Sequence, residues 1–314
     1  MASVAIVGRG QLGNAVAEVL RAGGRHEVRG PFGRMECGEG TSSGVDVVVI
    51  ATTTRFADIS GHVEAAVIAG SNVLVTAEEA ADPSIVDPIL SARLDDLARQ
   101  RGVSICGAGV NPGLIFDALV LTLLGATDTL VDIVARRTVD ISGFGPAVLR
   151  RIGVGLDTVE FEAGVAGGSV LGHAGFPQSM SVVAKAVGIR IDHVDRRLTP
   201  LISTEDIILA NGVRIAAGQA VGVDQEYVGV AEGRPWYTAS FFGHCTLPST
   251  GNSATDVIEF WRDGEIERSF VATPGIGAQH GSRNMVANSI DRILKARSGW
   301  ISVADLPPAT PQRN

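Results

Sequence analysis

Four short stretches of the sequence carry groups of the types that bind phosphates or move protons. The run GRGQLG at residues 8–13 has the spacing of a glycine turn whose backbone N–H groups approach a pyrophosphate. Glu78 and Glu79 are adjacent carboxylates that could face a nicotinamide and its substrate or cap the next element. Asn111 offers an amide that could orient a substrate but cannot act as a general base. His173 belongs to the residue type that exchanges protons near neutral pH.

The glycine turn stands between a strand-like run and a helix-like run. Ser3 to Val7 is β-type, and Ala15, Val16, Val19 and Leu20 recur at helical spacing. In such a context Gly8 permits the tight turn, Gly10 lets the backbone approach the phosphates, and Gly13 lets the helix pack near the strand. We therefore expect a dinucleotide site, the alternative being a plain glycine turn.

The end of the second expected strand, about His26 to Gly30, indicates which dinucleotide binds. An acidic residue there would bind the ribose 2′-hydroxyl of NAD, but Glu27 lies early and Arg29 stands at the end. Arg29 and Arg34 could pair with a 2′-phosphate, so NADP is favoured and NAD is the alternative. The competing interpretation is that both arginines are solvated surface charges.

Strands and helices alternate over the first hundred residues or so. Val45 to Ala51 is a nearly continuous apolar run typical of a buried parallel strand, with Thr52, Thr53 and Thr54 after it. Further strands are expected at 72–76 and 103–106, and helices at 62–69 and 85–101. This alternation predicts an N-terminal Rossmann domain with a doubly wound parallel sheet. The expected cofactor-binding residues are Gly8, Arg9, Gly10, Gln11, Leu12, Gly13, Arg29, Arg34, Ala51, Thr52, Thr53, Glu78 and Asn111.

The pattern changes after an apolar helix-like run at 114–124. Strand-like segments follow at 130–139, 197–202, 213–223, 226–230 and 236–244, with a helix expected at 179–187. We therefore expect an α/β protein with three segments: a dinucleotide-binding domain at 1–128, an α+β substrate and dimerisation domain on an open mixed sheet at 129–275, and a C-terminal part at 276–314. Helical periodicity at 279–296 predicts a helix that returns to the Rossmann domain, and the proline-containing tail, 306–314, is expected to be draped or disordered.

Composition and charge exclude several classes of function. The 314 residues have a net charge of -8, which argues against nucleic acid or an anionic membrane as partner. The three cysteines are far apart and form no C-x-x-C pair, so neither a disulfide framework nor a metal site is indicated. No apolar run has the length of a membrane span, and no signal peptide is recognisable, so we expect a cytoplasmic protein that acts on a small molecule.

Each candidate side chain also has a purely structural interpretation. Glu78 and Glu79 could cap the next helix, and Asn111 could close a turn before Pro112. A lone histidine such as His173 is more often structural than catalytic. Asp140, Ser142, Phe144 and Phe176 follow strand-like or glycine-containing segments and are expected to line the substrate pocket.

Five stretches in order along the chain resemble a known family. These are GRGQLG, VTAEEA at 75–80, GAGVNPG at 107–113, LGHAGFPQS at 171–179, and the terminal TPGI with DLP at 305–307. They resemble the dihydrodipicolinate-reductase-like group, and within it the 2,4-diaminopentanoate dehydrogenases and native amine dehydrogenases. The resemblance implies an NAD(P)-binding domain, a second domain that provides the pocket and the contact of a homodimer, and hydride transfer at a carbon that bears an amine or imine.

The resemblance also implies roles for the candidate residues. Dihydrodipicolinate reductases proper carry a histidine pair, which is absent here, so that substrate is not expected. A carboxylate near the substrate nitrogen is implied at Glu78 or Glu79, with Asn111 and His173 beside it. The leading hypothesis is an NADP-linked amine dehydrogenase or imine reductase that acts on an amine, ketone or imine. The alternatives are a reductase of a preformed cyclic imine or carbonyl intermediate, and a non-catalytic protein that binds NADPH.

Overall fold

The computed structural model describes residues 1–311, and the chain forms two compact units. Unit 1 contains residues 1–125, 178–189 and the chain from residue 278 onward, while unit 2 contains 126–177 and 190–277. The helix near residue 180 thus groups with the N-terminal part, although it lies within the segment expected to form the second domain. Of the expected tail, 306–314, residues 312–314 lie outside the described residues.

Unit 1 is built on a six-stranded parallel sheet in the order β14-β5-β4-β3-β1-β2. The strands β3, β4 and β5 are buried along nearly their whole length, as expected for a sheet covered on both faces. The strand bounds are β1 Ala2–Val7, β2 His26–Phe32, β3 Val47–Ile50, β4 Asn72–Val75, β5 Ser104–Gly107 and β14 Gly299–Ile301.

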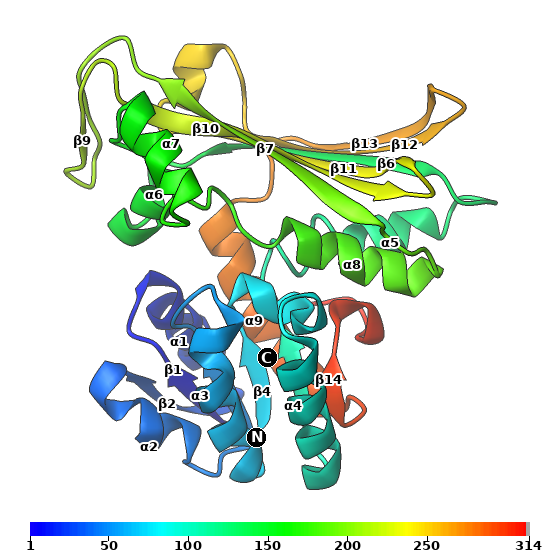
Figure 1. Cartoon of the computed structure of the whole chain (residues 1–314). Coiled ribbons are helices and arrows are strands. Elements are labelled where there is room, and N and C mark those ends of the chain that lie inside the picture. The colour runs from blue at the N-terminus through cyan, green and yellow to red at the C-terminus, as the bar shows by residue number, and fades with distance from the viewer. Residues whose placement is uncertain (312–314) are drawn as a thin grey trace. The chain divides into compact units, whose positions relative to one another are not determined.

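Two hydrophobic clusters lie on opposite faces of this sheet. One contains Val16 and Leu20 of α1 with Val286 and Ile290 of α9, and the other contains residues of α2, α3 and α4. The helices α1 and α9 pack against each other on one face, with α1 near β1 and α9 near β4 (Figure 1). The doubly wound Rossmann arrangement predicted from the sequence is therefore confirmed. The helix bounds are α1 Gln11–Gly23, α2 Cys37–Thr41, α3 Phe56–Ile68, α4 Pro88–Arg101, α5 Ala118–Leu124, α8 Phe176–Val187 and α9 Ala278–Ile293.

Unit 2 is built on a six-stranded mixed sheet in the order β13-β12-β6-β11-β10-β7. The pair β6 and β11 is parallel and the other pairs are antiparallel, so the predicted mixed sheet is confirmed. The strand bounds are β6 Asp132–Asp140, β7 His193–Ile202, β10 Ala220–Ala231, β11 Arg234–His244, β12 Thr255–Arg262 and β13 Glu265–Ala272, with a separate short pair β8 Ile207–Ile208 and β9 Arg214–Ile215.

The helices α6 Pro146–Ile152 and α7 Thr158–Ala166 lie on one side of the unit 2 sheet (Figure 1). Within the sheet, Arg137 of β6 and Asp256 of β12 form a buried ion pair with 2.7 Å between nitrogen and oxygen. The second Asp256 oxygen accepts a hydrogen bond from the Ile276 N–H at 2.7 Å. This carboxylate therefore fixes the irregular segment between β13 and α9.

Several element boundaries differ from the sequence expectation. The segments 213–223 and 226–230 were expected as two strands, but β10 runs without interruption through Ala220–Ala231, and Arg214–Ile215 belongs to the short pair. The helix-like run at 114–124 is helical only from Ala118, because Asp117 caps it and accepts from the Ala118 N–H at 2.7 Å. The strand β2 continues to Phe32, two residues beyond its expected end.

Candidate active site

The glycine turn that follows β1 has the shape that a dinucleotide backbone requires. Gly8 has a φ of 122°, and a Cβ there would lie 2.1 Å from the Ala51 carbonyl oxygen. A Cβ on Gly13 would lie 2.0 Å from the Gly8 carbonyl oxygen, so only glycine lets α1 begin this close to the turn. A Cβ on Gly10 would meet no atom within 4 Å, which leaves the turn open on that side. The turn therefore fits a pyrophosphate at the start of α1.

A pocket of about 390 Å³ adjoins this turn. The predicted residues Gly8, Arg9, Gly10, Arg34, Ala51, Thr52 and Thr53 line it. Cys37, Asp58 and His62 line it as well and were missed, because their side chains come from helices that the sequence pattern did not connect with the cofactor. The predicted residues Gln11, Leu12 and Gly13 are the first residues of α1, and Glu78 and Asn111 lie in the loops after β4 and β5.

Arg29 is placed differently from the expectation. It pairs in register with Ala5 in the middle of β2, and its Nε donates to Glu27 at 3.0 Å. The sequence-based placement at the end of the strand was wrong because β2 continues through Gly30 and Pro31 to Phe32, where the register with β1 shifts. Arg34, in contrast, lies just past the true end of the strand and lines the pocket at the glycine turn.

Arg9 and Glu36 form a charged pair beside the end of β2. The Arg9 guanidinium lies 2.7 Å from Glu36 and donates from Nε to the Pro31 carbonyl oxygen at 2.8 Å. Glu36 also accepts from the Gly33 N–H at 3.0 Å. This end of the strand therefore offers Arg9 and Arg34 as cations and Glu36 as an acid, where an adenine ribose binds in this fold.

Glu78 and Glu79 open the loop after β4, and the structure shows the contacts of Glu79. Glu79 accepts from the backbone N–H of Phe56, the first residue of α3, at 2.7 Å, and its own N–H donates to the Thr54 carbonyl oxygen at 3.3 Å. Glu79 therefore satisfies a free N–H group at the start of α3, the role expected of a capping carboxylate. Glu78 is half-buried in the same 3₁₀ turn, Glu78–Ala81.

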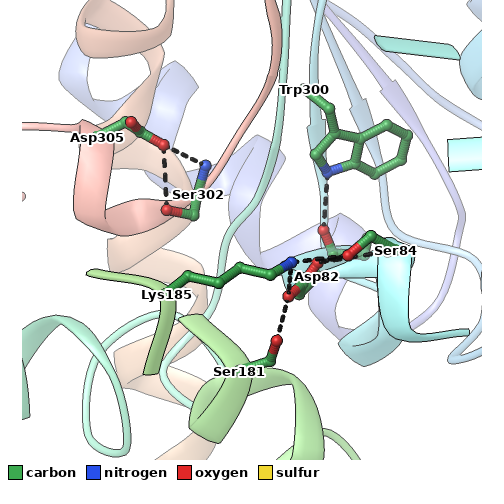
Figure 2. A network of polar contacts seen from close by, with 8 residues as sticks. Asp82, Ser84, Ser181, Lys185, Trp300, Ser302 and Asp305 are labelled. Atoms are coloured by element: carbon green, nitrogen blue, oxygen red, sulfur yellow. Dashed lines mark hydrogen bonds and ion pairs between the residues drawn. The ribbon is translucent and has the colours of Figure 1, made fainter. Parts of the chain in front are cut away.

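The loop that carries these glutamates is attached to two other elements of unit 1 (Figure 2). Asp82 is buried and accepts from the Ser181 hydroxyl and the Lys185 ammonium of α8, both at 2.6 Å. Lys185 also donates to the Ser84 hydroxyl at 2.7 Å. The Trp300 indole N–H of β14 donates to the Ala80 carbonyl oxygen at 3.1 Å. We call Asp82, Ser84, Ser181 and Lys185 the Asp82 network.

The loop after β5 is organised by Asp117, which is fully buried. Its carboxylate accepts from the Gly113 N–H at 2.8 Å and from the Ser179 hydroxyl of α8 at 2.9 Å. Burial raises the pKa of this carboxyl above its usual range, although its hydrogen bonds act in the opposite direction. Asn111, also buried, lies in the loop that Asp117 holds. Asp117 was missed because the sequence pattern placed it inside the helix-like run 114–124 and not at the start of a helix.

His173 in unit 2 lies among aromatic rings. Its ring centroid is 4.9 Å from that of Phe241 and 5.4 Å from that of Phe176. Buried Gln225 fixes the backbone here, since its Oε1 accepts from the His173 N–H at 2.8 Å and its amide donates to the His173 carbonyl at 3.0 Å. Burial, with the charges of Arg151 and Arg137, lowers the pKa of His173 to about 3.

The low pKa determines what His173 can do. The imidazole is neutral at neutral pH, and its Nδ1 lies 2.8 Å from the Ala174 carbonyl oxygen, which can only accept. The proton therefore sits on Nδ1, and Nε2 is the acceptor. A histidine with this pKa does not exchange protons near neutral pH, which is the role that the sequence suggested for His173.

The other predicted pocket residues also lie in unit 2. Phe176 is fully buried and its ring stacks on Tyr227 at 5.0 Å. Asp140 ends β6 and accepts from the Ser142 N–H at 2.8 Å, and the Phe144 carbonyl accepts from the Asn211 amide at 3.2 Å. Asp140 is paired in register with His244 at the end of β11, whose pKa is lowered by burial.

The described residues offer neither a metal site nor a membrane-spanning helix. Residues 1–311 contain no group of three or more His, Cys, Asp or Glu side chains arranged to hold a metal ion. In the same part of the chain, no helix is both long and apolar enough to cross a membrane.

The parallel sheet with its glycine turn, followed by a mixed-sheet unit, defines a protein of the Rossmann-fold class with a second α+β unit. The chain belongs to the 2,4-diaminopentanoate dehydrogenase family, whose C-terminal domain model matches residues 114–312. It is 30% identical over 308 residues to the 2,4-diaminopentanoate dehydrogenase of Acetoanaerobium sticklandii, covering 97% of this chain and 86% of that protein. The family resemblance read from the sequence motifs is therefore confirmed.

Solved structures agree with this fold. The amine dehydrogenase from Mycobacterium smegmatis superposes with a TM-score of 0.85 at 19% identity, covering 99% of this chain and 97% of that one. A probable dehydrogenase from Thermotoga maritima superposes with a TM-score of 0.58 at 12% identity, over 96% and 92% of the two chains. At these identities the likeness shows the fold alone.

Proposed function

We propose that the protein is an NAD(P)-dependent dehydrogenase that oxidises a primary amine and, in reverse, forms that amine from a carbonyl compound and ammonia. The observation that carries this proposal is the pair of glutamates after β4. Glu79 is engaged at the start of α3, and Glu78 is the second carboxylate of the same turn. Ligands of doubly wound sheets bind at the carboxyl ends of the strands, where this turn lies. Membership of a family named for an amine substrate supports the same reaction class.

The residues of unit 1 suggest how the chain contributes to the reaction. A bound nicotinamide would accept the hydride from the carbon that bears the nitrogen. Glu78 would hold the substrate ammonium and take its proton, since the amine must be neutral before its carbon gives up a hydride. Asn111, held in the loop that Asp117 organises, would orient the substrate with its amide. Water then replaces the nitrogen, giving the carbonyl product and ammonia.

We propose NADP as the preferred cofactor, through Arg34 and Arg9. Both line the pocket at the glycine turn, and Arg34 follows the end of β2, where the 2′-phosphate of NADP binds in this fold. Glu36, paired with Arg9, supports NAD as the alternative. Arg34→Ala should weaken NADPH binding about tenfold and NADH binding much less, as measured by fluorescence titration.

Arg29→Ala is the matched control for this titration, because Arg29 pairs with Glu27 in the middle of β2. It should leave both affinities unchanged. Equal weakening of NADPH and NADH by Arg34→Ala would contradict the 2′-phosphate assignment.

The proposed function is tested by following reduced-nicotinamide absorbance while the protein meets NADP⁺ or NAD⁺ and a panel of primary amines. The panel should contain simple amines, 2-amino acids and diamino acids, with the corresponding alcohols as controls. Amine-dependent reduction, lost in Glu78→Gln, is the expected result. Cofactor binding without turnover on any amine would instead indicate a reductase of preformed imines or a non-catalytic binder.

A further inference from the structure

Arg283 lies on the face of α9 that packs against the parallel sheet of unit 1. It follows Gln279 by four residues and precedes Val286 by three, so the three share one helical stripe. Val286 is fully buried in the cluster that α9 forms with α1. Arg283 itself is half-buried, and a charged group that is partly removed from water is stabilised by a partner.

The guanidinium of Arg283 has no such partner among residues 1–311. Its Nε is inaccessible to solvent and makes no hydrogen bond within that part of the chain. Other arginines of unit 1 in comparable surroundings are engaged: Arg25 forms an ion pair with Asp291 of α9 at 2.8 Å, and Arg292 donates to the Thr310 hydroxyl at 3.1 Å. The buried Nε–H of Arg283 therefore has a hydrogen-bonding capacity that an anionic ligand could satisfy.

The neighbours of Arg283 show to which part of unit 1 its side chain extends. Side chains of a helix lean toward the N-terminus of the helix, so Arg283 extends toward the first turn of α9. There Gln279 accepts from the side-chain amide of Gln11, in the glycine turn, at 2.7 Å. Ser282 accepts from the Val110 N–H of the loop after β5 at 3.3 Å. Both contacts lie at the carboxyl edge of the sheet, beside the cofactor turn and the Asn111 loop.

We propose that Arg283 is an anion-binding residue of this site and pairs with an oxyanion that a ligand brings. The anion is a carboxylate of the substrate or a phosphate of the dinucleotide, and a guanidinium binds either through paired N–H donors. The carboxylate case rests on the proposed amine dehydrogenase function and makes the substrate an amino acid. The phosphate case depends only on dinucleotide binding.

Arg283→Gln tests this assignment by removing the charge with little loss of length. Dissociation constants for NADPH are measured by fluorescence titration, and KM is measured for an amino acid and for the amine that lacks its carboxylate. A rise of about tenfold in the NADPH constant identifies a phosphate. A similar rise in KM for the amino acid, with the amine and NADPH unchanged, identifies a carboxylate.

Arg292→Gln, on the last turn of the same helix, is the matched control and should change none of these constants. Arg283→Lys keeps the charge and should retain part of the affinity, so it serves if Arg283→Gln does not fold. If the wild type turns over no amine, the thermal shifts produced by NADPH, inorganic pyrophosphate and the amino acid replace the kinetics. A folded Arg283→Gln protein with every constant or shift unchanged would overturn the proposal.

Discussion

At the scale of single residues, the structure gives one of the two adjacent glutamates, Glu79, a capping contact with α3. The sequence predicted a carboxylate site at 78–79 but left open which residue points toward the ligand. Glu79 accepts from the Phe56 N–H, which comes from a segment 23 residues earlier, at the start of α3. A local pattern contains no information about that contact, so the capping role of Glu79 could not be predicted from the sequence.

The capping contact of Glu79 and the proton-accepting role proposed for Glu78 predict different phenotypes for the two substitutions. Glu78→Gln should lower kcat by about a hundredfold or more, because an amide cannot take a proton from the substrate, while the unfolding midpoint stays unchanged. Glu79→Gln keeps an acceptor for the Phe56 N–H and should retain most of the activity. Steady-state kinetics give kcat for both variants, and thermal unfolding gives their unfolding midpoints. A larger loss of kcat in Glu79→Gln would reverse the assignment.

His173 gives a prediction on pH. Its native pKa of about 3 lies below that of a histidine in an unfolded chain, so the unfolded state takes up a proton first as the pH falls. The contribution of this residue to stability is therefore complete above about pH 6.5 and declines from there toward pH 3. His173→Asn, whose amide can also donate to the Ala174 carbonyl, should lose less stability than the wild type between about pH 7 and pH 5.

Urea unfolding at several pH values measures this slope, and the exposed His193 supplies the control through His193→Asn. The pH profile of kcat in His173→Asn should keep its midpoints, since a group with this pKa does not titrate in the working range. Loss of a midpoint near pH 6.5 would restore His173 as a proton carrier.

At the scale of elements, the Asp82 network joins the loop after β4 to α8. Asp82→Asn should lower the free energy of unfolding by about 2 kcal/mol, because a buried carboxylate that accepts from Lys185 and Ser181 loses its charge. As a positioning residue for Glu78, it should also lower kcat while the dissociation constant of the cofactor stays the same. Unfolding curves and kinetics of the same preparations provide both readouts.

Glu64→Gln is the control for Asp82→Asn, because it breaks the more exposed ion pair with Arg93. Its unfolding midpoint and kcat should match the wild type. If Asp82→Asn lost stability and kept full kcat, the network would be structural support without influence on the site.

Most elements of unit 1 followed from the sequence, whereas unit 2 was predicted less completely. Buried parallel strands and amphipathic helices have strong periodic patterns, and the expected segments overlap β3, β4, β5 and α4. The hairpin of β12 and β13 was missed although Asp263-Gly264 connects two β-type runs, a turn signal that could have identified it. Arg29 was misplaced because the continuation of β2 through Gly30 and Pro31 has no signature in the sequence.

At the scale of the whole molecule, the reactivity of the three cysteines measures how accessible the interior of each unit is. Burial raises the pKa of Cys106 in unit 1 and of Cys245 in unit 2 to about 12, so both thiols are protonated at neutral pH. Cys37 lies at the pocket beside the glycine turn and donates to the Gly33 carbonyl at 3.3 Å. The native protein should react slowly with a thiol reagent at Cys37 alone, and NADP⁺ should slow this reaction further.

Mass spectrometry of the labelled protein identifies the modified residue, and Cys37→Ser should remove the native-state labelling. All three thiols should react once the protein is unfolded in urea. Rapid native labelling of Cys106 or Cys245 would show that the core of its unit opens far more easily than its burial indicates.

The central claim is that this chain makes and breaks a carbon–nitrogen bond with a nicotinamide cofactor. The most direct measurement is the rate of NADPH oxidation with a panel of ketones and aldehydes, in the presence and absence of ammonium. We predict oxidation that requires both the carbonyl compound and ammonium, with the amine as product, and its loss in Glu78→Gln. Oxidation that proceeds equally without ammonium, yielding an alcohol, would contradict the account.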